Sequence, residues 1–380
     1  MLHAVPRWSD QETESLRTTA AAFLRKTATP HLADWSARGH VDRDLWHGAG
    51  DLGLLCVSVP EEYGGGGGTI AHDMVVFEET VRADARGFGN LVHSGIVAHY
   101  ILGLGTEEQK HRWLRAMASG RCIGALAMSE PGAGSDVASI TTRARREGDG
   151  FVLTGAKTFI SNGAMCDVVV VAAKTDSHAG SHGVSLFIVD TRTPGFRRGR
   201  TLDKIGCKSQ DTAELFFDDV RVGAQDLLGQ ENQGFQHLMA NLAQERLLMA
   251  LDAIAAAERA VELAIEHTRA RHAYGKPLFD LQGVRFELAE CATLTSVTRS
   301  FVDDCVAELL NGRLTAARAA MAKYWATDVQ GRVIDRMLQL FGGYGYMLEY
   351  PIAQLYIDAR YSRIAGGANE VMKDIIARAL

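Results

Sequence analysis

The sequence predicts a mainly helical α+β fold in which two helical regions flank a small antiparallel sheet. Apolar residues recur at three- and four-residue spacing before about residue 121 and again after about residue 230. Between these regions lie short β-branched or aromatic runs, separated by Gly, Asn, Asp and Pro. A chain of 380 residues has room for several hydrophobic cores. We therefore expect an N-terminal α-helical domain over 1–121, a middle antiparallel β-sheet domain over 122–230, and a C-terminal four-helix bundle over 231–380.

The N-terminal region predicts five helices, because its apolar residues repeat with helical periodicity. Thr106 followed by Glu107 and Glu108 is typical of a helix start. The run Gly64–Gly68 follows no apolar strand and precedes no Lys-Ser/Thr pair, so it favours a flexible connector over a phosphate-binding loop. The five expected helices cover 10–27, 43–52, 70–86, 90–104 and 107–119.

The middle region predicts strands, and helical periodicity then returns to the end of the chain. Glycine-rich breaks such as Gly342-Gly343-Tyr344-Gly345 separate the later helices. The arginine-rich runs Arg143–Arg146 and Arg197–Arg200 are most simply solvated loops. The expected strands lie near 151–153, 168–172, 184–189, 214–217 and 220–222, and the expected helices near 234–270, 281–310, 314–341 and 368–379.

Composition excludes several classes of function. The formal net charge is −6, so the chain has no basic excess for nucleic acid or an anionic membrane. No apolar run reaches the roughly 18 residues of a membrane span, and the acidic start of the chain resembles no secretory or transit peptide. The six Cys form no Cys-x-x-Cys pair and the His residues show no ligand spacing, so we expect reduced thiols and no metal. These features favour a cytoplasmic protein.

The segment Ala127-Met-Ser-Glu-Pro-Gly-Ala-Gly-Ser-Asp136 is the most informative one in the sequence. Its glycines allow close approach of the backbone to a flat ligand or a pyrophosphate, and its serines supply hydrogen bonds. A Ser/Asp-rich turn without function is the alternative. The order of elements excludes a doubly wound nucleotide-binding fold, since that fold needs strands alternating with helices.

This segment resembles the first signature of the acyl-CoA dehydrogenase family, whose members are FAD flavoproteins. Further segments resemble family motifs in the same order, and together with the first signature they cover essentially the whole chain. Within the family, the sequence is most similar to the long-chain branch. The further segments are Phe159–Gly163, Lys204–Asp219, then Arg271–Lys276 together with Gln339–Tyr346, and finally Ile364–Arg378.

The resemblance implies an enzyme with FAD as cofactor that oxidises an acyl-CoA to a trans-2-enoyl-CoA. A carboxylate removes the α-proton of the thioester, and the β-hydrogen passes as hydride to the flavin N5. Most of the family carries this base as a Glu at the position of Gly366. Either this chain has lost dehydrogenation, or its base is Glu245, which matches the position used by the long-chain and isovaleryl branches.

The residues around Glu245 allow an independent check. Leu238, Leu242, Glu245 and Met249 follow one another at spacings that place them on one helical face. A carboxylate on such an apolar face is desolvated and its pKa is raised. A structural ion pair with an arginine is the alternative for an arbitrary glutamate. Glu370 is the weaker candidate for the base, because it falls where the family contacts FAD.

The resemblance also assigns binding roles. Gly366 keeps a backbone N–H for the thioester carbonyl, and Ser135 and Arg246 are expected near the substrate. The loss of side chain at Gly366 leaves room in the acyl pocket for a longer or branched chain. The flavin ring and pyrophosphate are assigned to Met128, Ser129, Gly134, Ser135, Phe159 and Ser161, with Ala368 and Glu370 also at the cofactor, and the adenosine half to Arg271, Tyr274, Gln339 and Gly343 of a neighbouring subunit.

The shared cofactor site implies a homo-oligomer, and the family usually forms a homotetramer. An electron-transfer flavoprotein is the expected electron acceptor. Two rivals stay open from the sequence: the same chemistry on an acyl or aminoacyl carrier protein, and a non-catalytic FAD-binding scaffold. The scaffold is motivated by Gly366, whereas retention of Glu245 argues against it.

Overall fold

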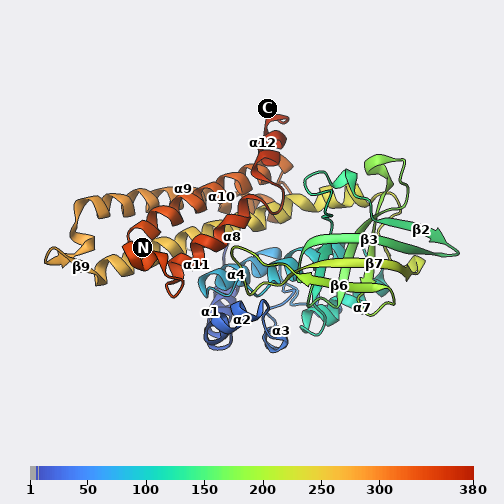
Figure 1. Ribbon diagram of the computed structural model, residues 1–380, viewed down its shortest axis with the longest axis horizontal. Coiled ribbons are helices and arrows are strands. Elements are labelled where there is room, and N and C mark those ends of the chain that lie inside the picture. Colours follow the sequence, from blue (N-terminus) through green and yellow to red (C-terminus); the bar gives the residue numbers. More distant parts are fainter. Residues whose placement is uncertain (1–5, 7) are drawn as a thin grey trace.

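The computed structural model describes Pro6 and residues 8–380. Helices form one end and the middle of an elongated molecule, and the sheet forms the other end (Figure 1). The described helices of the N-terminal region are α1 (Gln11–Thr27), α2 (Leu32–Arg38), α3 (Arg43–Asp51), α4 (Ile70–Arg82), α5 (Asn90–Val92), α6 (Ala98–Leu104) and α7 (Glu107–Ala118), with a π-helical turn, η3 (His93–Val97), between α5 and α6.

The expected N-terminal helices are present, with two differences. The Thr106 side chain caps α7 by accepting from the backbone N–H of Gln109, as its sequence signature indicates. The expected helix over 90–104 is interrupted by η3, a type of turn that often marks a functional site. Helix α2 was not expected, because seven residues are too few for a clear periodic signal.

The glycine run Gly64–Gly68 is not a free connector. The backbone N–H of Gly67 donates to the carbonyl of Val59, and that of Gly68 donates to the carbonyl of Val57. A Cβ added to Gly65 would lie 2.1 Å from the Val59 carbonyl oxygen. The glycines are needed here for this close backbone approach, which the sequence pattern alone does not reveal.

The middle region forms one sheet in the order β6-β7-β3-β2-β4-β5-β8, with β1 added beside β4. Most neighbours are antiparallel, whereas β1 runs parallel to β4, and β2 meets β4 in one parallel pair. The strands are β1 (Gly124–Ala127), β2 (Arg143–Glu147), β3 (Gly150–Ser161), β4 (Val168–Lys174), β5 (Val184–Asp190), β6 (Phe196–Thr201), β7 (Thr212–Val222) and β8 (Leu227–Leu228).

The two arginine-rich runs are strands, so their assignment to loops was wrong. Strand β2 pairs with β3, and β6 pairs with β7. Their arginine side chains are largely exposed, while the backbone hydrogen bonds are made to the neighbouring strand. A run of charged residues indicates that the side chains are exposed, but it does not show whether the backbone pairs with another strand. This is why the two runs were assigned to loops.

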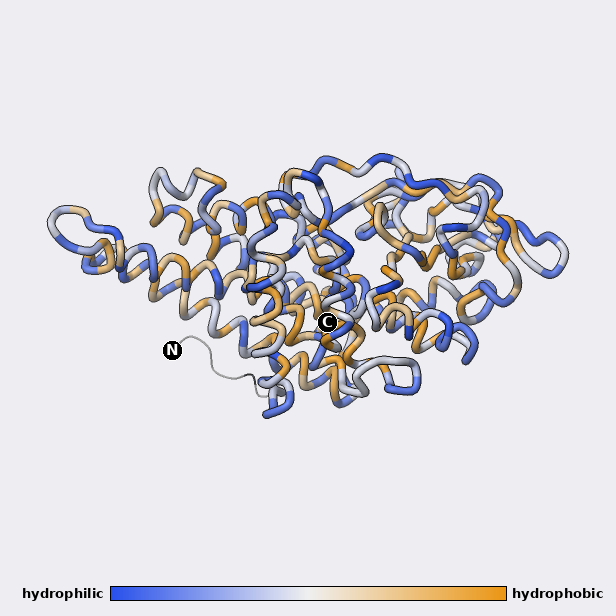
Figure 2. Tube along the Cα trace, turned by 90° about the horizontal axis from the view of Figure 1, so that it is seen from below, coloured by the Kyte–Doolittle hydropathy of each residue, from blue (hydrophilic) through white to orange (hydrophobic). Residues whose placement is uncertain are grey.

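The C-terminal region is built around α8 (Gly234–Ala270), a helix of 37 residues that is about 55 Å long at 1.5 Å per residue. Helix α8 packs against α4, α9 and α10, and their buried faces form one continuous core. Hydrophobic residues are frequent in the middle of the molecule, and the loops at both ends are largely hydrophilic (Figure 2). The other elements are β9 (His272–Ala273), β10 (Lys276–Pro277), α9 (Gln282–Leu310), α10 (Ala316–Gln339), α11 (Pro351–Asp358) and α12 (Asn369–Ala377).

The described part of the chain contains no helix long and apolar enough to span a bilayer. Its six cysteines are all buried and free, as the spacing predicts. It also contains no group of three or more His, Cys, Asp or Glu side chains placed to hold a metal ion.

Candidate active site

Glu245 lies on α8 at a point where the helix passes from the sheet region into the helical core. Its side chain is buried, and Leu238 and Met249 on the same face are also buried. The Tyr100 hydroxyl, on α6, donates to Glu245 Oε1 at 2.8 Å. Burial raises the pKa of Glu245 to about 7, against the opposing effects of the Tyr100 hydrogen bond and the Arg246 charge. Among the described residues Glu245 makes no ion pair within 4 Å, which is unlike a structural carboxylate.

Arg246 is the next residue on α8 and is also buried. Its Nε has no hydrogen-bond partner among the described residues. Burial lowers the pKa of Arg246, and the neighbouring Glu245 partly offsets this effect. A buried guanidinium N–H without an acceptor is costly, so this donor fits a site that is completed by a ligand.

The loop before α12 approaches the same face of α8. Gly366 has φ +64°, and a Cβ there would lie 3.2 Å from Cγ of Met249, one turn beyond Glu245. Lys323, which is fully buried on α10, donates to the carbonyl of Gly367 at 2.7 Å and to Asn369 Oδ1 at 3.0 Å. The loop that carries Gly366 therefore packs against α8 one turn after Glu245, and Lys323 ties the same loop to α10.

The loop after β1 is fixed by a buried ion pair. Lys157 Nζ, on β3, contacts Glu130 Oε1 at 2.9 Å and donates to the Met128 carbonyl at the same distance. The backbone N–H groups of Thr141 and Thr142 also donate to the Glu130 carboxylate. Burial opposes ionisation of Glu130, but Lys157 and these hydrogen bonds lower its pKa to about 2. The ion pair of Lys157 with Glu130 thus holds both ends of the 128–142 loop: Lys157 binds Met128, and Glu130 binds Thr141 and Thr142.

The surface beside this loop carries an exposed aromatic ring. Phe159 is 69% exposed and has φ +60°, a conformation that is rare for a bulky residue. It lies at an irregularity in the pairing of β3 with β7. The carbonyl of Ser129 accepts from the backbone N–H of Thr158, the residue before Phe159, at 3.0 Å. Ser129 and Ser161 are half-buried, while Gly134 and Ser135 are exposed.

The second group of expected cofactor residues lies at the opposite end of the molecule. Arg271 follows α8, and its guanidinium lies 5.5 Å from the ring centre of Tyr344. Tyr274, at the turn between β9 and β10, is 92% exposed. Gln339 and Gly343 are exposed near the same end. Figure 1 shows the β9 hairpin far from β3, so one chain does not bring the two groups to a single site.

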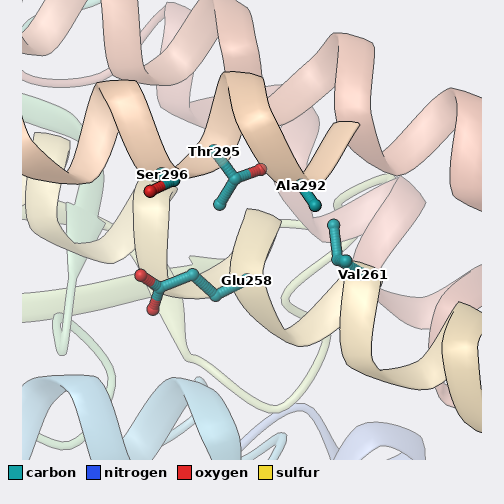
Figure 3. A pocket seen from close by; sticks show the side chains of 5 residues that line it. All are labelled: Glu258, Val261, Ala292, Thr295 and Ser296. Carbon is teal, nitrogen blue, oxygen red and sulfur yellow. The ribbon is translucent and has the colours of Figure 1, made fainter. Parts of the chain in front are cut away.

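Two hollows outside this region do not include Glu245. The smaller, of about 10 Å³, lies between α8 and α9 and is lined by Glu258, Val261, Ala292, Thr295 and Ser296 (Figure 3). Glu258 is 13 positions after Glu245 on α8, about 20 Å away along the helix. The larger, of about 510 Å³, is lined by residues of α10, α11 and the following turn, including Arg332, Tyr356 and Arg363.

Comparison with known proteins decides the family. Three family models match: the acyl-CoA dehydrogenase N-terminal domain over residues 10–121, the middle domain over 125–220 and the C-terminal domain over 232–380. The chain is 46% identical over 376 residues to the long-chain specific acyl-CoA dehydrogenase, mitochondrial, of Sus scrofa, covering 98% of this chain and 87% of that protein. The chain belongs to the acyl-CoA dehydrogenase family.

Two solved structures extend this likeness to the fold. An acyl-CoA dehydrogenase from Geobacillus kaustophilus superposes with a TM-score of 0.96 at 44% identity, covering 99% of each chain. A structure described as an electron transferring flavoprotein of Acidaminococcus fermentans superposes with a TM-score of 0.94 at 34% identity, covering 98% of each chain. The expected mainly helical architecture with a central sheet is therefore confirmed, and the chain is an oxidoreductase for FAD-dependent acyl-CoA dehydrogenation.

The residues of this acyl-CoA dehydrogenase fit the cofactor of its family. The exposed Phe159 ring has a free face that could accept a flat ring system, and Gly134 and Ser135 in the 128–142 loop are exposed. Ala368 is half-buried at the start of α12, whereas Glu370 is exposed in its first turn. An exposed aromatic face beside exposed glycine and serine groups fits the binding of a flavin cofactor.

Several residues of the site were missed in the sequence. Tyr100, Glu130, Lys157 and Lys323 act through partners that are 27 to 145 positions away in the chain. Glu130 lies inside the signature segment, so its position between Ser129 and the glycines was a usable signal. No comparable signal marks Tyr100, since only the tertiary contact of α6 with α8 gives it a role.

Proposed function

We propose that Glu245 is the base that removes the α-proton of an acyl-CoA, giving a trans-2-enoyl-CoA. The observation that supports this role is the burial of the Glu245 carboxylate. It has no ion pair among the described residues, and its hydrogen bond comes from Tyr100. The α-proton leaves to this carboxylate, and the β-hydrogen leaves with its electron pair. Bound FAD supplies the acceptor for that hydrogen.

The surroundings of Glu245 suit a proton acceptor. A carboxylate with an ordinary pKa is too weak a base for a thioester α-carbon, and burial strengthens it by destabilising the charged form. With a pKa of about 7, Glu245 is both basic and substantially ionised near neutral pH. The rate of dehydrogenation is expected to rise with pH through about 7, because the base acts only when ionised.

Gly366 and Arg246 are proposed to act on the thioester. Polarising the carbonyl requires donors aimed at its oxygen, and the backbone N–H of Gly366 is one. The glycine contacts Met249 on the Glu245 face and adds no side chain to the pocket. Arg246, with its unpartnered Nε, and Ser135 are proposed to bind other parts of the acyl-CoA.

We propose the following contacts to FAD. The ring and pyrophosphate contacts come from the middle region of one subunit, and the adenosine contacts from a neighbouring subunit, because the two groups lie at opposite ends of the chain (Figure 1). The first group is Met128, Ser129, Gly134, Ser135, Phe159 and Ser161, with Ala368 and Glu370; the second is Arg271, Tyr274, Gln339 and Gly343.

This sharing supports a homo-oligomer, and we propose a homotetramer of subunits divided at 1–121, 122–230 and 231–380. The likeness to the Acidaminococcus fermentans structure supports an electron-transfer flavoprotein as electron acceptor. We also propose a cytoplasmic location, because a bacterial acyl-CoA dehydrogenase, that of Bacillus subtilis, is 36% identical over 372 residues.

Anaerobic titration tests the function. Acyl-CoAs of short, branched and long chain are added to the FAD-loaded protein, and loss of the oxidised-flavin absorbance is followed. Glu245→Gln is expected to slow bleaching by about 10²–10⁴-fold, whereas Glu107→Gln, an exposed carboxylate on α7, leaves it unchanged. Bleaching that survives Glu245→Gln at the wild-type rate contradicts the assignment of the base. If no acyl-CoA bleaches the flavin but an acyl group attached to a carrier protein does, the assignment of acyl-CoA as the substrate is contradicted.

A further inference from the structure

The two carboxylate oxygens of Glu245 have different surroundings. Oε1 accepts the Tyr100 hydroxyl at 2.8 Å. Oε2 accepts no hydrogen bond from any residue that the structure describes. It is also not fully enclosed by protein atoms. One oxygen is therefore held by the protein and the other is left free.

The same segment holds the residue before Glu245. The Gln244 side-chain N–H donates to the carbonyl of Gly95 at 3.0 Å, within the π-helical turn that precedes α6. A Cβ at Gly95 would lie 2.7 Å from Leu248 Cδ1, so the turn packs directly against α8. The turn and α6 thus hold α8 at two consecutive residues, Gln244 and Glu245.

Tyr100 is well suited to a fixed contact. Its side chain is fully buried among Val97, Ile101 and Leu238 of the same hydrophobic cluster. Burial and the neighbouring carboxylate raise the pKa of its hydroxyl far above the ordinary value, so it remains a hydrogen-bond donor at all working pH values. The titratable groups that act on Glu245 are the neutral Tyr100 hydroxyl from α6, through its hydrogen bond, and the charged Arg246 from α8 itself.

We propose that Tyr100 is a positioning residue that binds Oε1 of Glu245 and so reserves Oε2 for the α-proton of the substrate. This inference rests on the proposed role of Glu245 as the base. Because the hydroxyl donates a stronger hydrogen bond to the carboxylate than to the neutral carboxyl group, it also limits how far burial raises the pKa of the base. Loss of the hydroxyl should therefore leave a carboxyl group that is harder to ionise and less well oriented.

Tyr100→Phe removes the hydroxyl and keeps the ring. The pH midpoint of flavin bleaching by acyl-CoA is expected to move up by about one unit, and the rate at high pH, where Glu245 is ionised, is expected to fall by about tenfold. Tyr63→Phe is the matched control, because Tyr63 is a buried ring of the same cluster whose hydroxyl donates to Glu107, not to Glu245. It should leave both quantities unchanged.

A second readout needs no substrate. The carboxylic-acid stretch of Glu245 is identified by infrared difference spectroscopy as the band that Glu245→Gln lacks, and its titration is followed in the FAD-loaded protein. The midpoint is expected near 7 in the wild type and about one unit higher in Tyr100→Phe. In wild-type protein with ring-labelled tyrosine, protonation of Glu245 should also shift one tyrosine vibration. Glu245→Gln should abolish that shift. This measurement decides the point even if Tyr100→Phe does not fold.

The outcomes separate the two proposals. If Glu245→Gln bleaches like the wild type, the role of Glu245 fails. If Glu245→Gln is inactive while Tyr100→Phe matches the wild type in bleaching rate and midpoint, the positioning role of Tyr100 is overturned. Absence of any tyrosine mode coupled to the titration of Glu245 overturns it as well.

Discussion

At the scale of a single residue, the burial of Glu245 makes it a stronger base but lowers the stability of the fold when the carboxyl group ionises. Its carboxyl group is buried, and burial raises its pKa from 4.5 to about 7. The folded state therefore prefers the protonated form, and ionisation of this group favours unfolding. The stabilising contribution of the neutral carboxyl is fully present below the unfolded pKa of about 4.5 and is lost as pH rises through about 7.

The Glu245→Gln variant should therefore become more stable relative to the wild type as pH rises. At about 1.4 kcal/mol per pKa unit, its free energy of unfolding relative to the wild type is expected to increase by about 3 kcal/mol between pH 4.5 and 8. Urea unfolding at a series of pH values measures this difference. Glu107→Gln is the control, because Glu107 is exposed and its pKa is lowered by Tyr63 and Lys110. A pH-independent difference for Glu245→Gln would show that the carboxyl is solvated in the folded state.

The contact between α10 and the loop before α12 matters at the scale of elements. Gly366 and Gly367 both have positive φ, at +64° and +93°, so the loop has a backbone shape that few other residues adopt. Lys323 donates to the carbonyl of Gly367 and to Asn369, and Asn369 in turn donates to Thr327 on α10. These bonds tie the loop that carries Gly366 to α10.

Lys323→Met should loosen this loop without emptying the core. The carbonyl of Gly367 would lose its donor, which is expected to lower the free energy of unfolding by about 1–3 kcal/mol. Amide hydrogen exchange is expected to accelerate over 364–370 more than in the sheet. The kcat for acyl-CoA should fall while binding of free FAD changes little, since the proposed loss is in placing the Gly366 donor. Unchanged exchange in this segment would mean that Lys323 does not hold the loop.

At the scale of the whole molecule, the separation between the β3 end and the β9 hairpin has a functional consequence (Figure 1). If FAD is held between subunits, each active site needs Glu245 from one chain and Arg271 with Tyr274 from its neighbour. Tyr274 is 92% exposed in the single chain, and the neighbouring subunit would then cover it.

Mixed oligomers test this arrangement. Arg271→Ala and Glu245→Gln subunits, each purified alone, are expected to be almost inactive. Co-expressed, they should regain activity, because a subunit with intact Glu245 then receives an intact Arg271 from its partner. With random pairing of equal amounts, about half of the dimers contain such a site. Activity is measured on doubly tagged, affinity-purified mixed oligomers. No recovery in them would indicate that cofactor binding is completed within one chain.

Much of this enzyme can be predicted from local sequence. The periodicity that predicts 234–270 matches α8 (Gly234–Ala270), because a long amphipathic helix repeats one signal many times. The burial of Glu245 follows from its place on an apolar stripe of that helix, and its raised pKa follows from burial. Short elements such as α2 and α11 were missed because they offer only about two turns of pattern.

What the sequence determined by itself was the family motifs, the long elements and the identity of the candidate base. Only the tertiary structure decided which groups surround that base. Tyr100 and Lys323 lie 145 and 78 positions from Glu245 in the chain, and their contacts depend on how α6 and α10 pack against α8 and its neighbouring loop. Periodicity reports which face of an element is buried, whereas a hydrogen bond between elements depends on their packing, which no local pattern records.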